Sequence, residues 1–148
     1  MEAVKILLIF IWIYLAFIAM SFWEAYVEGK NAWDRKKYGW KIKLGKYCLP
    51  AYHFYVFWIM WPLLLTLPLV IYGWNLELFG ILISAYFSGM IIEDFFWFVV
   101  NPTMKFRDSW NPKFANYFPW IVLGKFRIPL NYIIGIVIAL LSWYFIWS

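Results

Sequence analysis

Glu93 and Asp94 are the residues of this chain whose type and position best suit them to do chemistry. They lie in the apolar run Ile-Ile-Glu-Asp-Phe-Phe-Trp-Phe-Val-Val, roughly 10 Å of helix before that run ends at residue 100. A carboxylate at the centre of a membrane span costs about 2.5 to 3.5 kcal/mol, so such groups face protein or water. The helical period directs Glu93 into a bundle and Asp94 toward a different neighbour.

Three more polar residues are predicted to lie at the same depth as this acidic pair. Glu24 ends the first apolar run, His53 begins the second, and Asn101 follows the third. One imidazole with several carboxylates can bind a divalent metal, relay protons or act as a general acid and base. The sequence therefore predicts a polar cluster whose members are Glu24, His53, Glu93, Asp94 and Asn101.

The candidate catalytic groups within this cluster are Glu93, Asp94 and His53. No pair of ligands at helical spacing marks a metal site on one helix, so the metal and any cofactor stay open. Lys105 and Arg107 follow the third run and are predicted to contact an anionic lipid head group. The alternative is that a nearby Lys or Arg neutralises the buried carboxylates in a purely structural ion pair.

The elements that must position these residues follow from composition. The chain has 148 residues, of which 66% are hydrophobic and 14% charged, whereas soluble domains have roughly 25% charged residues. Lipid must therefore be the solvent for most of it. The four apolar runs, 4–23, 53–74, 76–100 and 128–147, are each long enough to cross a bilayer. We expect a single all-α, polytopic membrane domain over residues 1–148 with four transmembrane helices, the second kinked by Pro62 and Pro68.

The basic residues predict the orientation of these spans. Twelve of the thirteen Lys and Arg residues lie in the loops 24–52 and 101–127, and only Lys5 lies elsewhere. Such loops stay in the cytoplasm, so both termini are predicted to be outside, in a multi-pass protein of the cell membrane. The bilayer explains the net charge of +5, and no nucleic-acid partner is expected.

Both loops are predicted to lie against the membrane surface. The first mixes lysines with aromatic residues, a blend that suits an anionic bilayer. In the second, Asn101-Pro102 and Asn111-Pro112 favour the starts of short interfacial helices. The apolar stretch 116–124 is predicted to enter the interface or pack on the bundle. The two halves share a layout of span and long loop, but no internal repeat is predicted.

Small residues recur at four-residue spacing in two of the runs. Gly80, Ser84 and Ser88 form one stripe, and Gly135 with Ala139 forms another. Such spacing lets helices approach closely, within the chain or against a partner.

Three classes of function fit these features. The first is a non-catalytic subunit, scaffold or accessory factor of a membrane complex, whose partners are other membrane subunits or further copies of the chain. The second is a membrane-embedded enzyme that acts on a lipid or isoprenoid at the cytoplasmic interface through the Glu/Asp/His cluster. The third is proton or ion translocation in an oligomer.

Overall fold

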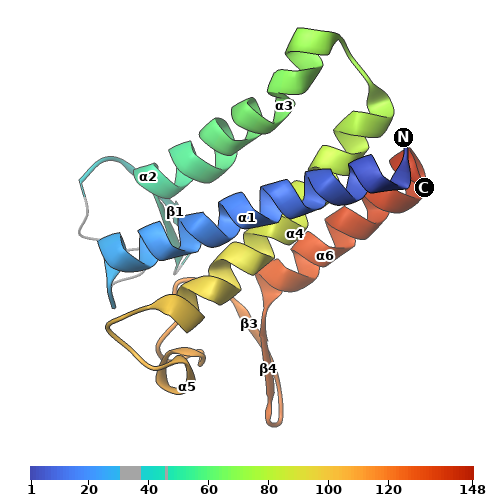
Figure 1. Cartoon of the computed structure of the whole chain (residues 1–148). Helices are drawn as coiled ribbons and strands as arrows, with labels where there is room; N and C mark the ends of the chain where they lie inside the picture. The colour runs from blue at the N-terminus through green and yellow to red at the C-terminus, as the bar shows by residue number, and fades with distance from the viewer. Residues whose placement is uncertain (31–37, 46) are drawn as a thin grey trace.

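Four helical segments, each long and apolar enough to cross a membrane, make up most of the computed structural model, which describes residues 1–30, 38–45 and 47–148 (Figure 1). They are α1 (Ala3–Glu28), the continuous segment α2 (Ala51–His53), η1 (Phe54–Met60) and α3 (Trp61–Tyr72), then α4 (Leu76–Val100), and α6 (Leu130–Ser142) continued by η2 (Trp143–Trp147). The four predicted helical runs are confirmed. The first helix, however, ends at Glu28 instead of residue 23, and the fourth begins at Leu130.

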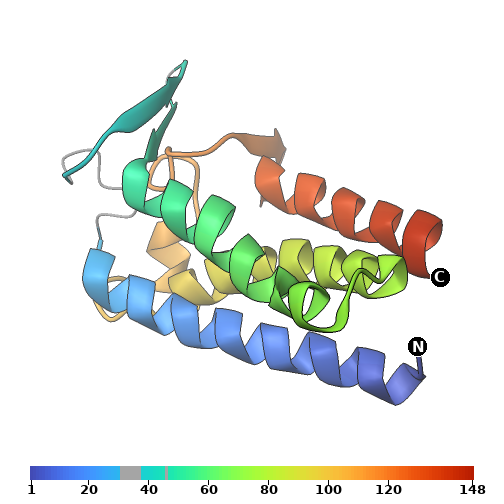
Figure 2. The same cartoon turned by 90° about the horizontal axis from the view of Figure 1, so that it is seen from above.

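Helix α4 is the central element of the bundle. Helices α1 and α6 pack along opposite sides of it, and α3 crosses it less closely (Figure 2). The core beside it contains the fully buried Phe17 ring, which stacks on Trp61 at 4.4 Å between ring centroids. Both chain termini lie at one end, where the Met1 amino group contacts Glu77. The long loops lie at the other end, which we call the loop end.

Each long loop contains a β-hairpin. In the first, β1 (Lys41–Leu44) pairs antiparallel with β2 (Tyr47–Pro50), and in the second, β3 (Trp120–Leu123) pairs with β4 (Phe126–Pro129). The predicted interfacial helices are not confirmed: among the described residues of the two loops, the single turn α5 (Phe106–Ser109) is the one helical element. The Asn111 side chain accepts hydrogen bonds from the amides of Lys113 and Phe114, which makes a local turn instead of a helix start.

The two hairpins are alike, although the sequence analysis predicted no internal repeat. Both contain the sequence Leu-Gly-Lys, at residues 44–46 and 123–125, and proline ends both second strands. Gly45 and Gly124 have φ angles of 61° and 60°, a conformation that tight hairpin turns require. In both units the first amide of the next helix donates to the residue before the hairpin, Ala51 to Trp40 and Leu130 to Pro119. A hairpin–proline–helix unit thus occurs twice.

Helix η1 has π-helical turns immediately before the first of the two prolines, Pro62. In this register a carbonyl accepts from the residue five positions later, as Val56 does from Trp61. The partner of the next carbonyl, that of Phe57, would be Pro62, which has no N–H. The Tyr86 hydroxyl of α4 donates to the Phe57 carbonyl instead. This hydrogen bond gives the Phe57 carbonyl a donor and joins η1 to α4.

The small-residue stripes pack helices of this chain against one another. A Cβ at Gly80 would meet Ile146, and one at Gly135 would meet Ile91. The Ser84 hydroxyl donates to the Ala139 carbonyl at 2.9 Å, and Ser142 donates to Gly80 at 2.8 Å. These faces are used inside the bundle, where α4 meets α6 and η2.

Part of the basic and aromatic run predicted to dock on the bilayer lies outside the described residues. The residues concerned are Trp33, Arg35, Lys36, Lys37 and Lys46.

The packing of α1 on α4 depends on Gly89. A Cβ at this position would overlap the buried Phe17 ring. We expect Gly89→Ala to lower the free energy of unfolding by about 1 to 3 kcal/mol, the usual range for an overpacked core. Thermal unfolding in a mild detergent measures the loss. Phe17→Leu removes the ring, so the double variant should be more stable than the sum of the two single losses predicts; strict additivity would contradict this account.

Candidate functional site

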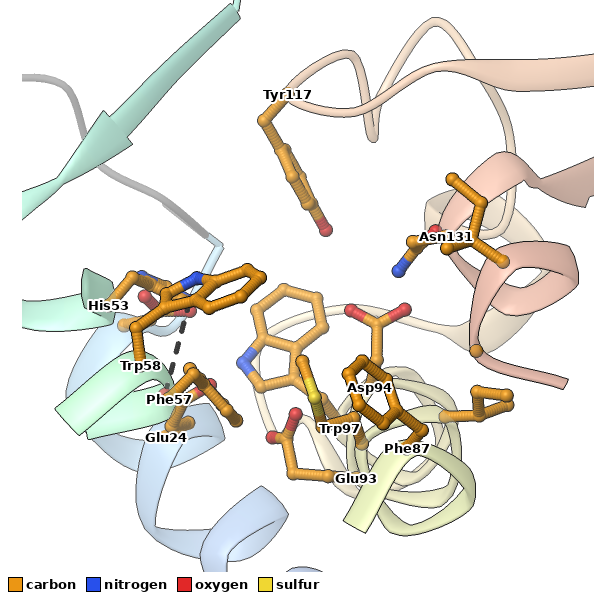
Figure 3. Close-up of a pocket in the computed structure, with 15 residues that line it drawn as sticks. Glu24, His53, Phe57, Trp58, Phe87, Glu93, Asp94, Trp97, Tyr117 and Asn131 are labelled. Carbon is orange, nitrogen blue, oxygen red and sulfur yellow. Dashed lines mark ion pairs between the residues drawn. The ribbon is translucent and has the colours of Figure 1, made fainter. Parts of the chain in front are cut away.

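A cavity of about 340 Å³ lies near the loop end of the bundle (Figure 3). Helix α4 forms its floor, α1 and η1 lie on one side, α6 lies on the other, and the segment before β3 covers it. Its polar and aromatic lining residues are Glu24, Glu28, His53, Phe57, Trp58, Phe87, Glu93, Asp94, Trp97, Tyr117 and Asn131. Four of the five residues of the predicted polar cluster therefore meet in one cavity.

Glu93 faces helix α1 from the centre of the site. Its carboxyl group lies close enough to that of Glu24 for the two to share a hydrogen bond. The imidazole Nε2 of His53 lies 4.0 Å from Glu24 Oε1, the contact drawn as a dashed line in Figure 3. Glu24, His53 and Glu93 thus form a chain of acid–base groups, each with only 4% of its surface exposed.

Asp94 faces the opposite side, toward α6. Its neighbours there are Tyr132 and Asn131, whose amide points toward the Asp94 carboxyl group in Figure 3. The repeated hairpin unit explains this placement, because His53 and Tyr132 each stand three residues after the proline that ends a hairpin. Each half of the chain thus supplies one carboxyl-bearing helix and one ring beside it.

Oε1 of Glu93, Oδ2 of Asp94 and the indole Nε1 of Trp97 belong to lining residues and have no hydrogen-bond partner among the described residues. Glu93 and Trp97 are the most deeply buried of the three, with 4% and 3% of their surfaces exposed. The two residues are one helical turn apart on α4, and both side chains point into the cavity in Figure 3. A buried donor or acceptor without a partner costs about 1 to 3 kcal/mol, which a ligand that supplies the missing partner would recover.

Three polar lining residues, Glu28, Tyr117 and Asn131, were not predicted from the sequence. Glu28 accepts a hydrogen bond from the Tyr52 hydroxyl, and its spacing of four from Glu24 would have placed both on one helix face had the first helix been extended. Tyr117 lies in the stretch 116–124, of which Tyr117 and Phe118 are buried while residues 122–124 are exposed, and its hydroxyl points into the cavity. Burial and the nearby carboxyl groups, Asp94 foremost, raise the pKa of the Tyr117 phenol well above its usual value, so it remains a hydrogen-bond donor.

Asn101 is not part of this site, which corrects its predicted place in the cluster. It ends α4 and is buried, but its amide donates to the Gly29 carbonyl at 2.6 Å, and its oxygen accepts from the Thr103 amide and hydroxyl. The residue joins the ends of α1 and α4. Lys105 and Arg107 are exposed and do not line the cavity, so they do not reach a head group held inside it.

The ionisable groups of the site are mostly acidic. Four carboxyl groups and one imidazole line the cavity, and no Lys or Arg of the described residues does. Neither Glu93 nor Asp94 forms an ion pair with a described Lys or Arg, so the structural ion pair considered from the sequence is not observed in that part of the chain. Within the described residues, no three His, Cys, Asp or Glu side chains are arranged to hold a metal. The arrangement can accept protons, donate them and attract a cation.

Comparison of this chain with models of known families, with curated proteins and with solved structures finds no match.

The placement of Asn101 predicts a structural role. Asn101→Ala should lower the free energy of unfolding by about 1 to 3 kcal/mol, because it leaves the Gly29 carbonyl without its side-chain donor and removes a cap of α4. Thermal unfolding of the purified variant checks this. The conservative variant Asn101→Asp keeps the acceptor for Thr103 and loses only the donor. Its melting temperature should therefore lie between those of the wild type and Asn101→Ala. An unchanged melting temperature for Asn101→Ala would show that this junction is not needed.

Proposed function

We propose that this chain is an integral membrane protein that binds a lipid-like ligand in the cavity at its loop end and acts on it by acid–base chemistry. The observation that carries this proposal is the pair of buried, unpartnered polar atoms, Glu93 Oε1 and Trp97 Nε1, in a cavity large enough for a small ligand. In this function Glu93 and Asp94 serve as acid and base. His53 acts through Glu24, and the Trp97 indole donates a hydrogen bond that positions the ligand.

The cavity favours this function over a purely non-catalytic subunit. A scaffold needs a surface for its partner, yet the small-residue faces of α4 and α6 already pack within the chain. It has no need of four carboxyl groups in one cavity, which cost stability. The accessory role and the translocation of protons or ions are the competing proposals, and a partner subunit or a flux would be their evidence.

The ligand can be sought in the protein as it is purified. We expect native mass spectrometry of gently extracted protein to show a bound small molecule at one per chain. Glu93→Gln should weaken its retention about 10-fold to 100-fold, the effect of losing a hydrogen bond to a charged group. Glu77→Gln, at the opposite end of the same helix, is the matched control and should retain the ligand.

Two outcomes would contradict the proposal. A stoichiometric foreign protein subunit without any bound small molecule would favour the accessory role. Equal retention by Glu93→Gln and wild-type protein would show that the cavity does not hold the ligand.

We further propose that the loop end faces the cytoplasm and that both termini lie outside the cell membrane. The supporting observations are the twelve basic residues in the long loops and the neighbouring chain ends. Cys48 lies in the first hairpin, and Ser148 is the last residue of the chain.

A membrane-impermeant maleimide tests this orientation on intact cells. It should label Ser148→Cys in a Cys48→Ala background, and it should label native Cys48 only after the cells are permeabilised. Labelling of Cys48 in detergent shows that the thiol is reachable. The reverse pattern would mean that the loops are outside.

A further inference from the structure

We propose that the ligand of this cavity is an amphiphile with an ammonium head group, and that it enters sideways from the lipid between η1 and α6. This inference rests on the function proposed above and adds to it the charge of the substrate and its route.

The route follows from which lining residues are exposed. Most of the lining is buried or half-buried, but Trp58 of η1 is 55% exposed, Ile134 of α6 is 50% exposed, and Asn131, one turn before Ile134, is exposed as well. Their helices lie on opposite sides of the α4 floor. Trp58 stands seven residues after Ala51, roughly 10 Å along the helix from its loop end. The mouth between these two side chains therefore opens on the apolar flank of the bundle, where lipid chains lie.

Toward the aqueous loops, the segment before β3 covers the cavity, and Asn131 in the first turn of α6 is the exposed lining residue on that side. Tyr117 lies over the cavity with 8% of its surface exposed, and the neighbouring Phe118 is 6% exposed. Apolar side chains of α4, those of Phe87, Met90 and Ile91, continue the lining toward the centre of the helix. A ligand seated here has its polar group near the loop end and its apolar part along α4. This arrangement is the one an amphiphile requires.

The head group is inferred from charge and from the aromatic walls. A cavity with four carboxyl groups and no described Lys or Arg in its lining repels an anionic head group and attracts a cation. The rings of Trp58, Trp97 and Tyr117 border the same space, and aromatic faces attract ammonium groups when water is excluded.

The missing hydrogen-bond partners of Glu93 and Trp97 restrict the head group further. Glu93 Oε1 needs a donor, which an ammonium N–H supplies, and Trp97 Nε1 needs an acceptor. An ammonium group with a nearby hydroxyl or ester oxygen supplies both. A long-chain amino alcohol or an aminoacyl lipid has this chemistry.

Three probes with the same chain length separate the possible head groups. Purified full-length protein in nanodiscs of zwitterionic lipid is titrated with dodecylamine, dodecanol or dodecanoate, and binding is counted above the partition into protein-free nanodiscs. We expect saturable binding of dodecylamine at one per chain. Dodecanol and dodecanoate should bind at least about tenfold more weakly, because neither supplies a positive charge to the carboxyl groups.

Two matched variants test the route. Ile134→Trp enlarges a side chain at the mouth and should weaken dodecylamine binding by at least about tenfold, because the added ring occupies the space the ligand needs. Ile136→Trp changes a residue of the same helix that is 46% exposed and does not line the cavity, so it should bind as the wild type does. If Ile134→Trp fails to fold, as judged by gel filtration, the smaller change Ile134→Phe takes its place.

The outcomes distinguish this inference from the function on which it rests. Tightest binding of dodecanol or dodecanoate, lost in Glu93→Gln, would overturn the ammonium head group but keep a ligand-binding cavity. Equal dodecylamine binding by the Ile134 and Ile136 variants would overturn the lateral route. Absence of saturable binding by any probe would overturn the amphiphile class, and if the purified protein also retained no native ligand, the proposed function would fall with it.

Discussion

The burial of carboxyl groups between α1 and α4 is the constraint on which the rest of this structure depends. Glu24 and Glu93 face each other at the place where both helices are covered by protein, and like charges taken out of water are costly unless other groups compensate them. The two helices can bring them together because Phe17 of α1 packs directly on Gly89, one turn before Glu93. The packing of the bundle and the acidity of the site are therefore set by one interface.

The remaining groups reach this interface through a unit that the chain uses twice. A hairpin ends in proline, the next helix starts at once, and the third residue of that helix is a ring beside a carboxyl group: His53 near Glu24, and Tyr132 near Asp94. Because each helix begins at the residue after its hairpin, the register of the hairpin determines where the ring of His53 or Tyr132 lies. The cavity forms where the two halves meet.

The four helices, and the level along the bundle at which the site residues lie, could be predicted from the sequence. Which other residues surround the site could not. Long apolar runs define spans, and span order fixes depth, so the common level of Glu24, His53, Glu93 and Asp94 could be predicted. Which way the amide of Asn101 turns depends on the Gly29 carbonyl of another helix, and the arrival of Tyr117 over the cavity depends on tertiary packing. Neither is encoded in local spacing. The hairpins were predictable, because Leu-Gly-Lys occurs twice and glycine at the first turn position favours a two-residue hairpin loop.

The loop end combines a basic surface with an acidic interior, and the two suit different lipids. In the proposed orientation, the lysines and arginines of the loops would attract anionic head groups to the surface, within about a Debye length of 8 Å, and oppose the approach of cations from water. The proposed mouth of the cavity lies on the flank of the bundle between Trp58 and Ile134. A cation that enters there along the plane of the bilayer would not have to cross the basic layer, and anionic lipids gathered at that layer would raise its local concentration. The proposed lateral route would therefore give the acidic cavity access to a positively charged ligand that the aqueous face of the same protein would repel.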